Sequence, residues 1–469
     1  MKYERRFQLK VSERRTLLKL GDALVIILAT LSALWIWALA DGSGPALGFF
    51  VFNSWWFVVL LGLWIILASA NDFYDLRLSS RPAQSLPRLA QIILQLLVAY
   101  LIIFFLSPRD ELPRLFILYY SLLSFSLILL WRTVVWALVI RRLGIKRRVL
   151  IIGAGWAART IVRALTEETP DDYEVVGLIA EFDPHDTLTN DVPVLGGGKE
   201  LVQVAEKERV SDLIMAYGTT LPGEIYQGVM DCYERGFSII PMPLLYEQVT
   251  GRVPVEHVGP EDWKIILPMI QTSIFNPFSP LKRLIDISLS LIGLFLFALI
   301  LPALALAIRL DSRGPIFYSQ ERVGKGGKLF HMIKLRSMVV DAEADGPRWA
   351  SAGDVRITRV GAIMRKARLD ELPQFINILK GEMSVVGPRA ERPYFVDQLS
   401  QEIPFYRTRH VVRPGATGWA QVKYTYGNSV EDSLIKLQYD LYYIRHQSLA
   451  LDMLIILRTI GKMVRLSGT

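Results

Sequence analysis

Residues 281–315, "LKRLIDISLSLIGLFLFALILPALALAIRLDSRGP", contain an apolar run from Leu284 to Ile308. About 20 residues of α-helix cross the hydrocarbon core of a bilayer, so this run is long enough to span. Basic residues stand on both sides of it, Lys282 and Arg283 before the run and Arg309 and Arg313 after it. Basic residues beside a membrane segment are retained on the cytoplasmic side. The flanks therefore favour a segment that enters the membrane and returns to the same face.

Pro302 lies inside the apolar run. An internal proline removes a helix hydrogen bond and kinks the helix axis. We therefore predict a re-entrant membrane helix over residues 281–310, bent at Pro302. The alternative is a kinked transmembrane helix, which a proline alone does not exclude. A crossing would carry the chain from residue 310 onward away from the cytoplasmic nucleotide pool.

The N-terminal part of the chain predicts a four-helix transmembrane domain over residues 1–145. Its apolar stretches cover residues 17–40, 49–70, 89–106 and 115–140. Lys and Arg crowd the segments before the first stretch and after the last, whereas the first outer loop holds no basic residue. Both ends of this bundle are therefore predicted to lie in the cytoplasm.

The composition supports a membrane protein and limits the chemistry of any site. Of the 469 residues, 52% are hydrophobic, which is high for a soluble protein of several domains. The net charge of +8 suits contact with anionic lipid and anionic substrates, although a positive-inside bias accounts for much of it. Cys232 is the single cysteine, which excludes an intramolecular disulfide and a Cys-cluster metal site. We expect membrane lipids as partners and no nucleic acid.

The stretch "RRVLIIGAGWAARTIVRAL", residues 147–165, predicts a strand, a glycine turn and an amphipathic helix. Similar alternation continues downstream and predicts a doubly wound, Rossmann-like α/β domain over residues 146–262, followed by a linker over residues 263–280. Gly153 and Gly155 fit a dinucleotide-binding turn, and Glu181 stands where a ribose-binding acid would lie. Glycines at such a turn also serve tight packing with no ligand, so a nucleotide site and a purely structural turn both stay open.

The stretch "IFYSQERVGKGGKLFHMIKLRSM", residues 316–338, predicts a β-hairpin with a glycine-rich, basic loop. Lys334 and Arg336 stand two positions apart on the second strand, so they are predicted to share one face of it. A basic loop of this kind can hold phosphate, but it is also typical of a solvated turn.

The stretch "ARLDELPQFINILKGEMSVVGPR", residues 367–389, places Asp370 and Glu371 just before Pro373. It predicts a helix that begins near Glu371 and ends before Gly381, with Asp370 as its N-cap. A cap and a catalytic site are both compatible with that pattern. Cations crowd the approach to the carboxylates and favour the catalytic alternative: Arg356, Arg359, Arg365, Lys366 and Arg368. A carboxylate kept ionised by such surroundings is a competent nucleophile, and two carboxylates can share Mg²⁺.

Residues 281–469 resemble the bacterial polyprenyl-phosphate sugar-1-phosphate transferases, the monotopic phosphoglycosyl transferases. The resemblance rests on motifs in the family's order: "KRLIDISLSLIGLFLFALILP", "RVGKGGKLF", "KLRSM", "LDELPQFINILKGEMSVVGPR" and "VRPGATGWAQV". The preceding membrane helices and Rossmann-like domain resemble the large subfamily that primes exopolysaccharide and O-antigen synthesis.

The resemblance implies a reaction and a set of site residues. UDP-hexose, with glucose or galactose the usual sugar, would give its sugar-1-phosphate to polyprenyl (undecaprenyl) phosphate and release UMP. Asp370 would be the nucleophile and, with Glu371, would contact Mg²⁺, while Glu371 would also assist as an acid/base partner. Candidate phosphate contacts are Arg389, Lys334, Arg336, Arg365, Arg368 and Arg413. The implied location is the bacterial inner membrane with the active site facing the cytoplasm, with downstream glycosyltransferases as partners and a homodimer as an allowed assembly.

The chain departs from the family pattern at two points. The break in the membrane helix is usually Ser-Pro but reads Leu301-Pro302 here, and the arginine motif continues with Ala390 instead of a second proline. Two rival functions follow from the same residues. One is a membrane-bound, nucleotide-sensing regulator or scaffold of polysaccharide assembly. The other is a sugar epimerase or dehydratase, which is disfavoured because no Tyr stands four residues before any Lys.

Overall fold

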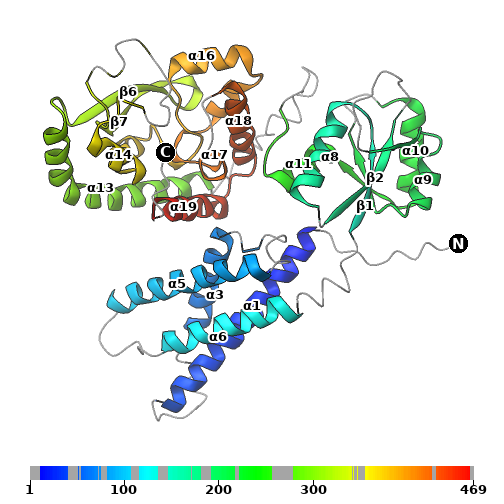
Figure 1. Ribbon diagram of the computed structural model, residues 1–469, viewed down its shortest axis with the longest axis horizontal. Coiled ribbons are helices and arrows are strands. Elements are labelled where there is room, and N and C mark those ends of the chain that lie inside the picture. Colours follow the sequence, from blue (N-terminus) through cyan, green and yellow to red (C-terminus); the bar gives the residue numbers. More distant parts are fainter. Residues whose placement is uncertain are drawn as a thin grey trace. The chain divides into compact units, whose positions relative to one another are not determined.

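The computed structural model (Figure 1) describes residues 11–40, 54–71, 73–74, 82–106, 116–135, 146–170, 172–180, 192–216, 221–255, 278–340, 354–424 and 429–464, together with residues 51, 342 and 346. Contacts divide the chain into two compact units, Met1–Ala216 with Pro222–Ile240, and Tyr217–Leu221 with Pro241–Thr469. Residues 241–255, which the sequence assigns to the middle domain, thus belong to the second unit. The other predicted domain boundaries remain predictions.

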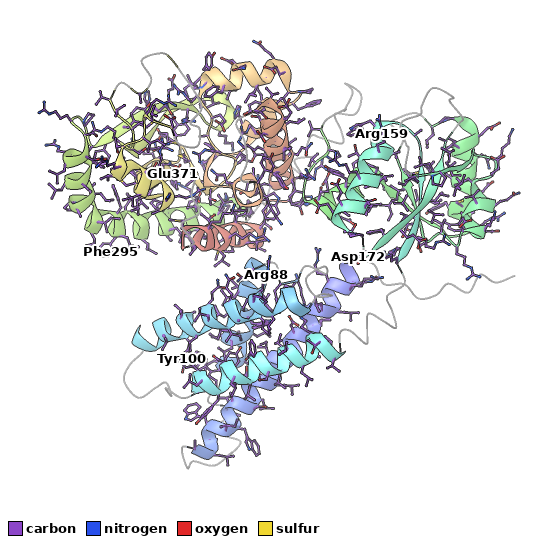
Figure 2. All side chains as sticks on the ribbon, in the orientation of Figure 1. Arg88, Tyr100, Arg159, Asp172, Phe295 and Glu371 are labelled. Atoms are coloured by element: carbon purple, nitrogen blue, oxygen red, sulfur yellow. The ribbon has the colours of Figure 1, made fainter. Side chains whose placement is uncertain are left out.

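The first unit begins with apolar helices. They are α1 Val11–Ala40, α3 Trp55–Ala70, α5 Pro82–Leu106 and α6 Phe116–Leu130, which continues as the π-helical turn η1 Trp131–Val135. Each overlaps one of the stretches predicted to span the membrane. The helices pack around a shared buried core that includes Leu34, Trp56, Leu96 and Tyr120; Tyr100, labelled in Figure 2, belongs to the same core.

Within the described ranges, three helices are both long enough and apolar enough to cross a membrane. They are Glu13–Ala40, Phe116–Val134 and Phe278–Asp311, while Trp55–Ser69 and Ser85–Leu101 are shorter apolar helices. Large apolar side chains point outward from them, for example Leu24, Val58 and Leu122, which are all more than half exposed. Such a surface is stable only against lipid or another apolar partner, so the chain is a membrane protein.

The second part of the first unit is a parallel α/β domain. Its elements are β1 Arg147–Ile152, α8 Trp156–Glu168, β2 Tyr173–Ile179, β3 Val194–Gly196, α9 Leu201–Lys207, β4 Asp212–Met215, α10 Gly223–Glu234 and β5 Ser238–Pro241. The strand order is β3-β2-β1-β4-β5, and β1 pairs in parallel with both β2 and β4. Val149–Ile152 are fully buried because helices cover a parallel sheet on both faces. The predicted doubly wound sheet is confirmed.

The second unit contains the C-terminal half of the chain. Its helices are α11 Met242–Thr250, α13 Phe278–Asp311, α14 Arg359–Lys366, α15 Gln374–Lys380, α16 Pro393–Glu402, α17 Trp419–Lys423, α18 Val430–Arg445 and α19 Leu449–Val464. Its strands are β6 Phe317–Val323, β7 Leu329–Leu335, β8 Ser384–Val386 and β9 Gly415–Thr417, with 3₁₀ turns η3 Lys325–Gly327, η4 Leu369–Glu371 and η5 Tyr406–Val411. The predicted hairpin is confirmed, since β6 and β7 are antiparallel around η3.

Helix α13 contains the apolar run from Leu284 to Ile308. It is 34 residues long, contains Pro302, and only 11% of its most apolar window is buried. Figure 1 shows the helix turning a corner along its length, as an internal proline predicts. Phe295, labelled in Figure 2, is one of its outward apolar side chains and is 65% exposed. The re-entrant path itself stays a prediction.

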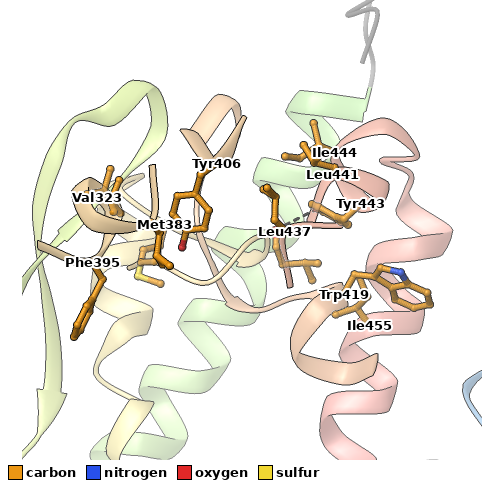
Figure 3. Close-up of a cluster of buried hydrophobic side chains, with 14 of the residues drawn as sticks. Val323, Met383, Phe395, Tyr406, Trp419, Leu437, Leu441, Tyr443, Ile444 and Ile455 are labelled. Carbon is orange, nitrogen blue, oxygen red and sulfur yellow. Dashed lines mark hydrogen bonds between the residues drawn. The ribbon is translucent and has the colours of Figure 1, made fainter. Parts of the chain in front are cut away.

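The core of the second unit gathers side chains from distant segments (Figure 3). Met383, Tyr406, Trp419, Leu437 and Tyr443 belong to it. Helices α18 and α19 contribute several of its buried side chains, among them Leu441, Tyr443 and Ile455.

Candidate active site

The two adjacent carboxylates lie on η4, a single 3₁₀ turn between α14 and α15. Helix α14 ends at Lys366, and Arg368 then adopts a left-handed conformation with φ 55°. That conformation costs a non-glycine residue roughly 1–2 kcal/mol, so the turn is held by its contacts. The backbone N–H of Glu371 closes it by donating to the Arg368 carbonyl at 3.3 Å.

The predicted N-cap role of Asp370 is wrong. Helix α15 begins only at Gln374, with Pro373 at its N-cap position, so Asp370 lies one turn too early to cap it. The end of the helix is as predicted, since Gly381 closes it in a left-handed conformation with φ 85°. The dipole of α15 is therefore not what sets the charge of Asp370.

Glu371 is surrounded by three cations. Lys334 Nζ donates to Glu371 Oε1 at 2.9 Å, and Arg389 Nη2 donates to the same oxygen at 3.3 Å. Arg368 Nη1 lies 3.6 Å from Glu371 Oε2. These cations hold the pKa of Glu371 well below its ordinary value despite burial. Glu371 is therefore an ionised anchor that organises Lys334, Arg368 and Arg389.

Asp370 has the opposite character. It is 6% exposed, and burial raises the pKa of its carboxyl, an effect reinforced by the neighbouring Glu371 charge and opposed by Lys334 and Arg365. In place of the predicted cap residue, the structure shows a buried carboxyl whose pKa is raised. A more basic carboxylate is a better nucleophile once ionised, so this pairing of an anchor with a reactive partner suits nucleophilic catalysis.

Arg389, which contacts Glu371, lies on a loop that follows β8 and contains Gly387. Strand β8 runs parallel to β9, and a Cβ at Gly387 would lie 2.4 Å from the Arg413 carbonyl oxygen. The backbones of the two quoted motifs, "VVGPR" and "VRPGATG", therefore touch directly, which no larger residue permits. The Arg389 side chain stays 44% exposed, so it can pair with Glu371 and still meet a phosphate.

A buried network that no sequence motif indicates supports the Arg389 backbone. Arg409 Nη2 donates to the Arg389 carbonyl at 3.2 Å and to Asp440 Oδ2 at 2.7 Å. Arg322 Nη1 donates to the Ala390 carbonyl at 3.0 Å, so the alanine that departs from the family pattern still has a fixed contact. Isolated arginines in polar segments carry no sequence signal for such a role.

The remaining predicted cations lie in different surroundings. Arg336 does not share a face with Lys334: it is buried just beyond β7 and donates to the carbonyls of Ser312 and Arg313 at 2.7 and 2.6 Å. These bonds fix the two residues that follow α13, and burial leaves Arg336 unavailable to a substrate. Strand β7 ends at Leu335, one residue before Arg336. Arg365 Nε donates to Ser337 Oγ at 3.0 Å and acts on Asp370 only through its charge. Arg413 is exposed before β9.

Asp370 and Glu371 differ in how well each could bind a metal ion. Nowhere in the described ranges do three or more His, Cys, Asp or Glu side chains gather in a way that could hold a metal. Mg²⁺ usually takes one or two carboxylates and completes its shell with water and substrate phosphates. Asp370 fits that pattern, whereas the oxygens of Glu371 already face three cations.

The glycine turn of the α/β domain follows β1, beside β4, where the strand order reverses. Ligands of doubly wound sheets bind at this point. Gly153 and Gly155 have φ 122° and 81°, so the backbone alone requires glycine at both positions. Glu181 lies outside the described residues. A nucleotide site here stays a prediction.

Comparison with known proteins agrees with the geometry of the second unit. The profile of the family described as "Bacterial sugar transferase" matches residues 278–466. A UDP-glucose:undecaprenyl-phosphate glucose-1-phosphate transferase of Klebsiella pneumoniae is 32% identical, over 69% of this chain and 69% of the relative. The chain belongs to the bacterial sugar transferases. The predicted resemblance to polyprenyl-phosphate sugar-1-phosphate transferases is confirmed.

Two further relatives of this bacterial sugar transferase differ in extent. The UDP-glucose:undecaprenyl-phosphate glucose-1-phosphate transferase of Escherichia coli K12 is 28% identical over 91% of both chains. The UDP-N-acetylgalactosamine-undecaprenyl-phosphate N-acetylgalactosaminephosphotransferase of Aeromonas hydrophila is 43% identical, over 51% of this chain and 55% of its own length. The match thus spans about half the length of that relative. Residues 69–243 match a family described as "CoA-binding domain".

Proposed function

We propose that this sugar transferase moves a sugar-1-phosphate from a UDP-hexose, glucose or galactose, to polyprenyl (undecaprenyl) phosphate and releases UMP. The observation that carries the proposal is the pair on η4: a buried carboxyl, Asp370, with a raised pKa beside an ionised anchor, Glu371, that gathers three cations. Relatives named for undecaprenyl-phosphate sugar transfer support the choice of substrates.

In the first step, a carboxylate oxygen of Asp370 attacks the phosphorus that carries the sugar. A P–O bond to Asp370 forms, the P–O bond to UMP breaks, and the phosphosugar stays on the enzyme as an acyl phosphate. Arg389 would bind phosphate oxygens; its side chain is 44% exposed and its Nη2 lies 3.3 Å from Glu371 Oε1, which supports this role. Lys334 and Arg368 hold Glu371 and add positive potential where charge develops.

In the second step, an oxygen of polyprenyl phosphate attacks the phosphorus of the acyl phosphate. The bond to Asp370 breaks, the carboxylate is restored, and the product is a polyprenyl-diphosphate sugar. No oxidant or reductant is needed in either step. Burial of Asp370 would limit the access of bulk water to the acyl phosphate and so slow its hydrolysis.

We infer that Asp370 supplies the protein ligand for Mg²⁺ and that diphosphate oxygens and water supply the others. The ion would neutralise charge on the diphosphate and its leaving group. The sequence assigned Glu371 to the metal as well. Its three cationic neighbours make it the weaker ligand and favour its role as an anchor.

The membrane arrangement is part of the proposal. Four apolar helices would span the inner membrane, and α13 would enter and return on the cytoplasmic side, where UDP-sugars are made. The basic flanks of α13 and its exposed apolar surface support this path. The reaction would be the first step of exopolysaccharide or O-antigen synthesis, so its product must go to downstream glycosyltransferases. A homodimer through the non-catalytic half is compatible with this role.

Nucleotide release tests the proposal. Purified protein with Mg²⁺ and undecaprenyl phosphate should release UMP from UDP-glucose or UDP-galactose, and from few other UDP-sugars. The measurement is a luminescent UMP assay with thin-layer analysis of the lipid product. Release of UDP in place of UMP would contradict it, since UDP marks transfer of the sugar without its phosphate.

A further inference from the structure

One membrane helix holds both ends of the segment that carries the carboxylate pair. This segment, residues 359–380, comprises α14, η4 and α15. At its start, the Val360 N–H donates to Asp311 Oδ2 at 2.8 Å. At its end, Arg283 donates through Nη1 to the Ile378 carbonyl at 2.6 Å and through Nη2 to the Leu379 carbonyl at 2.8 Å. Asp311 and Arg283 thus satisfy backbone groups that helix termini leave open.

The region between these two contacts is packed directly on the same helix. A Cβ at Gly293 of α13 would lie 2.4 Å from the Phe375 ring, so the helix backbone and the ring are in contact. Leu301 and Leu304 of α13 belong to one apolar cluster with Leu369 and Leu372, which flank the carboxylate pair. The turn that bears Asp370 therefore cannot move independently of α13.

The bend of α13 helps its two ends to reach one segment. A straight helix would separate Arg283 from Asp311 by about 42 Å. Figure 1 shows that α13 turns a corner, which brings its ends closer than that. The apolar surface of α13, including Leu291, Leu299 and Leu306, each more than half exposed, is suited to contact with lipid. On the proposed re-entrant path, the depth of α13 in the membrane would set the height of the turn that carries Asp370.

We propose that Arg283 and Asp311 are positioning residues that fix Asp370 at the height of the lipid acceptor's phosphate. This inference rests on the proposed function, because it concerns the second of its two steps. The nucleotide sugar is soluble and can reach Asp370 at a range of depths. The phosphate of a long polyprenyl chain is confined to the membrane surface by its own tail. A misplacement of about 1 Å can cost roughly 10²-fold in rate, and only the second step is bound to that height.

The test compares variants on three readouts. Arg283→Gln and Asp311→Ala remove the two contacts, and Arg309→Gln removes a charge from the same helix at an exposed position. The readouts are UMP release in the first turnover, transfer to long-chain polyprenyl phosphate in vesicles, and transfer to geranyl phosphate, which is short enough to approach from solution. We expect both variants to lose about 10- to 100-fold in transfer to the long-chain acceptor. UMP release and transfer to geranyl phosphate should stay within about threefold of wild type, and Arg309→Gln should match wild type throughout.

Conservative variants separate positioning from general instability. Asp311→Asn keeps an oxygen that accepts from Val360 N–H and should restore long-chain transfer, whereas Asp311→Ala should not. Should Asp311→Ala fail to fold, Arg283→Lys tests the positioning role instead. It keeps the positive charge but loses the forked pair of donors, so it should lose transfer to the long-chain acceptor and keep the other two readouts near wild type. Equal losses on all three readouts, or no loss on any, would overturn the positioning role. Absence of UMP release by the wild-type protein would instead overturn the proposed function.

Discussion

Replacing Asp370 by Asn is expected to lower the rate of UMP release by at least about 10⁴-fold and to abolish lipid product. The amide is close in shape to the carboxylate but has no oxygen able to form an acyl phosphate. Removing a nucleophile that acts with its neighbours costs rate factors of roughly this size. The measurement is single-turnover UMP release with a radiolabelled UDP-sugar.

A matched control is available on the exposed end of the same segment. Lys380→Gln changes an exposed side chain at the last position of α15 and should leave the rate within about twofold of wild type. A rate for Asp370→Asn near that of the control would exclude covalent catalysis at Asp370. It would favour a scaffold or regulatory role for the second unit.

Replacing Glu371 by Gln is expected to lower the rate about 10²- to 10³-fold and to shift its pH profile. In the wild-type protein, burial and the Glu371 charge raise the pKa of Asp370, so activity should fall on acidification at a pH above the ordinary aspartate pKa of about 3.9. The Glu371→Gln substitution removes the repulsion and leaves Lys334 nearby, which lowers the pKa of Asp370. The acid limb should therefore move to lower pH, as the pH dependence of single-turnover UMP release would show.

The direction of that shift is diagnostic. Lys334→Gln removes an attraction that stabilises the ionised Asp370, so its acid limb should move to higher pH. Opposite shifts in the two variants support the assignment of Glu371 as anchor and Asp370 as reactive carboxyl. Shifts in the same direction, or none, would contradict it.

Much of the architecture follows from local sequence patterns. Apolar length, basic flanks and Pro302 predict a bent membrane helix, and alternating strands and helices with a glycine turn predict the parallel sheet. These features depend on periodicity and on single residues with restricted backbones. The helix end at Gly381 is predictable for the same reason.

The environment of the carboxylate pair could not be read from the sequence in the same way. Pro373 suggests a helix start near Glu371, but a left-handed Arg368 inserts a separate 3₁₀ turn, which no residue preference indicates. The sequence places Lys334 and Arg336 at equivalent positions of one strand. In the structure β7 ends between them, and Lys334 bonds Glu371 whereas Arg336 bonds the Arg313 carbonyl. Burial of Asp370, and hence the direction of its pKa shift, depends on packing by segments far away in the chain.

The contacts of Arg409 and Arg283 could not be predicted from the sequence either. Both act on backbone carbonyls of residues that are 20 and 95 or more positions away in the chain. Every residue has a backbone carbonyl, so the sequence does not indicate which carbonyl a distant arginine will bond. Only the tertiary structure brings these pairs together.

The mass of the protein after incubation with donor alone tests the central proposal most directly. Protein mixed with UDP-glucose or UDP-galactose and Mg²⁺, without polyprenyl phosphate, should gain the mass of one hexose phosphate, and peptide mapping should place it on Asp370. Addition of polyprenyl phosphate should remove the adduct and yield the lipid product. Unmodified protein under conditions in which UMP and lipid product form together would contradict a covalent Asp370 intermediate.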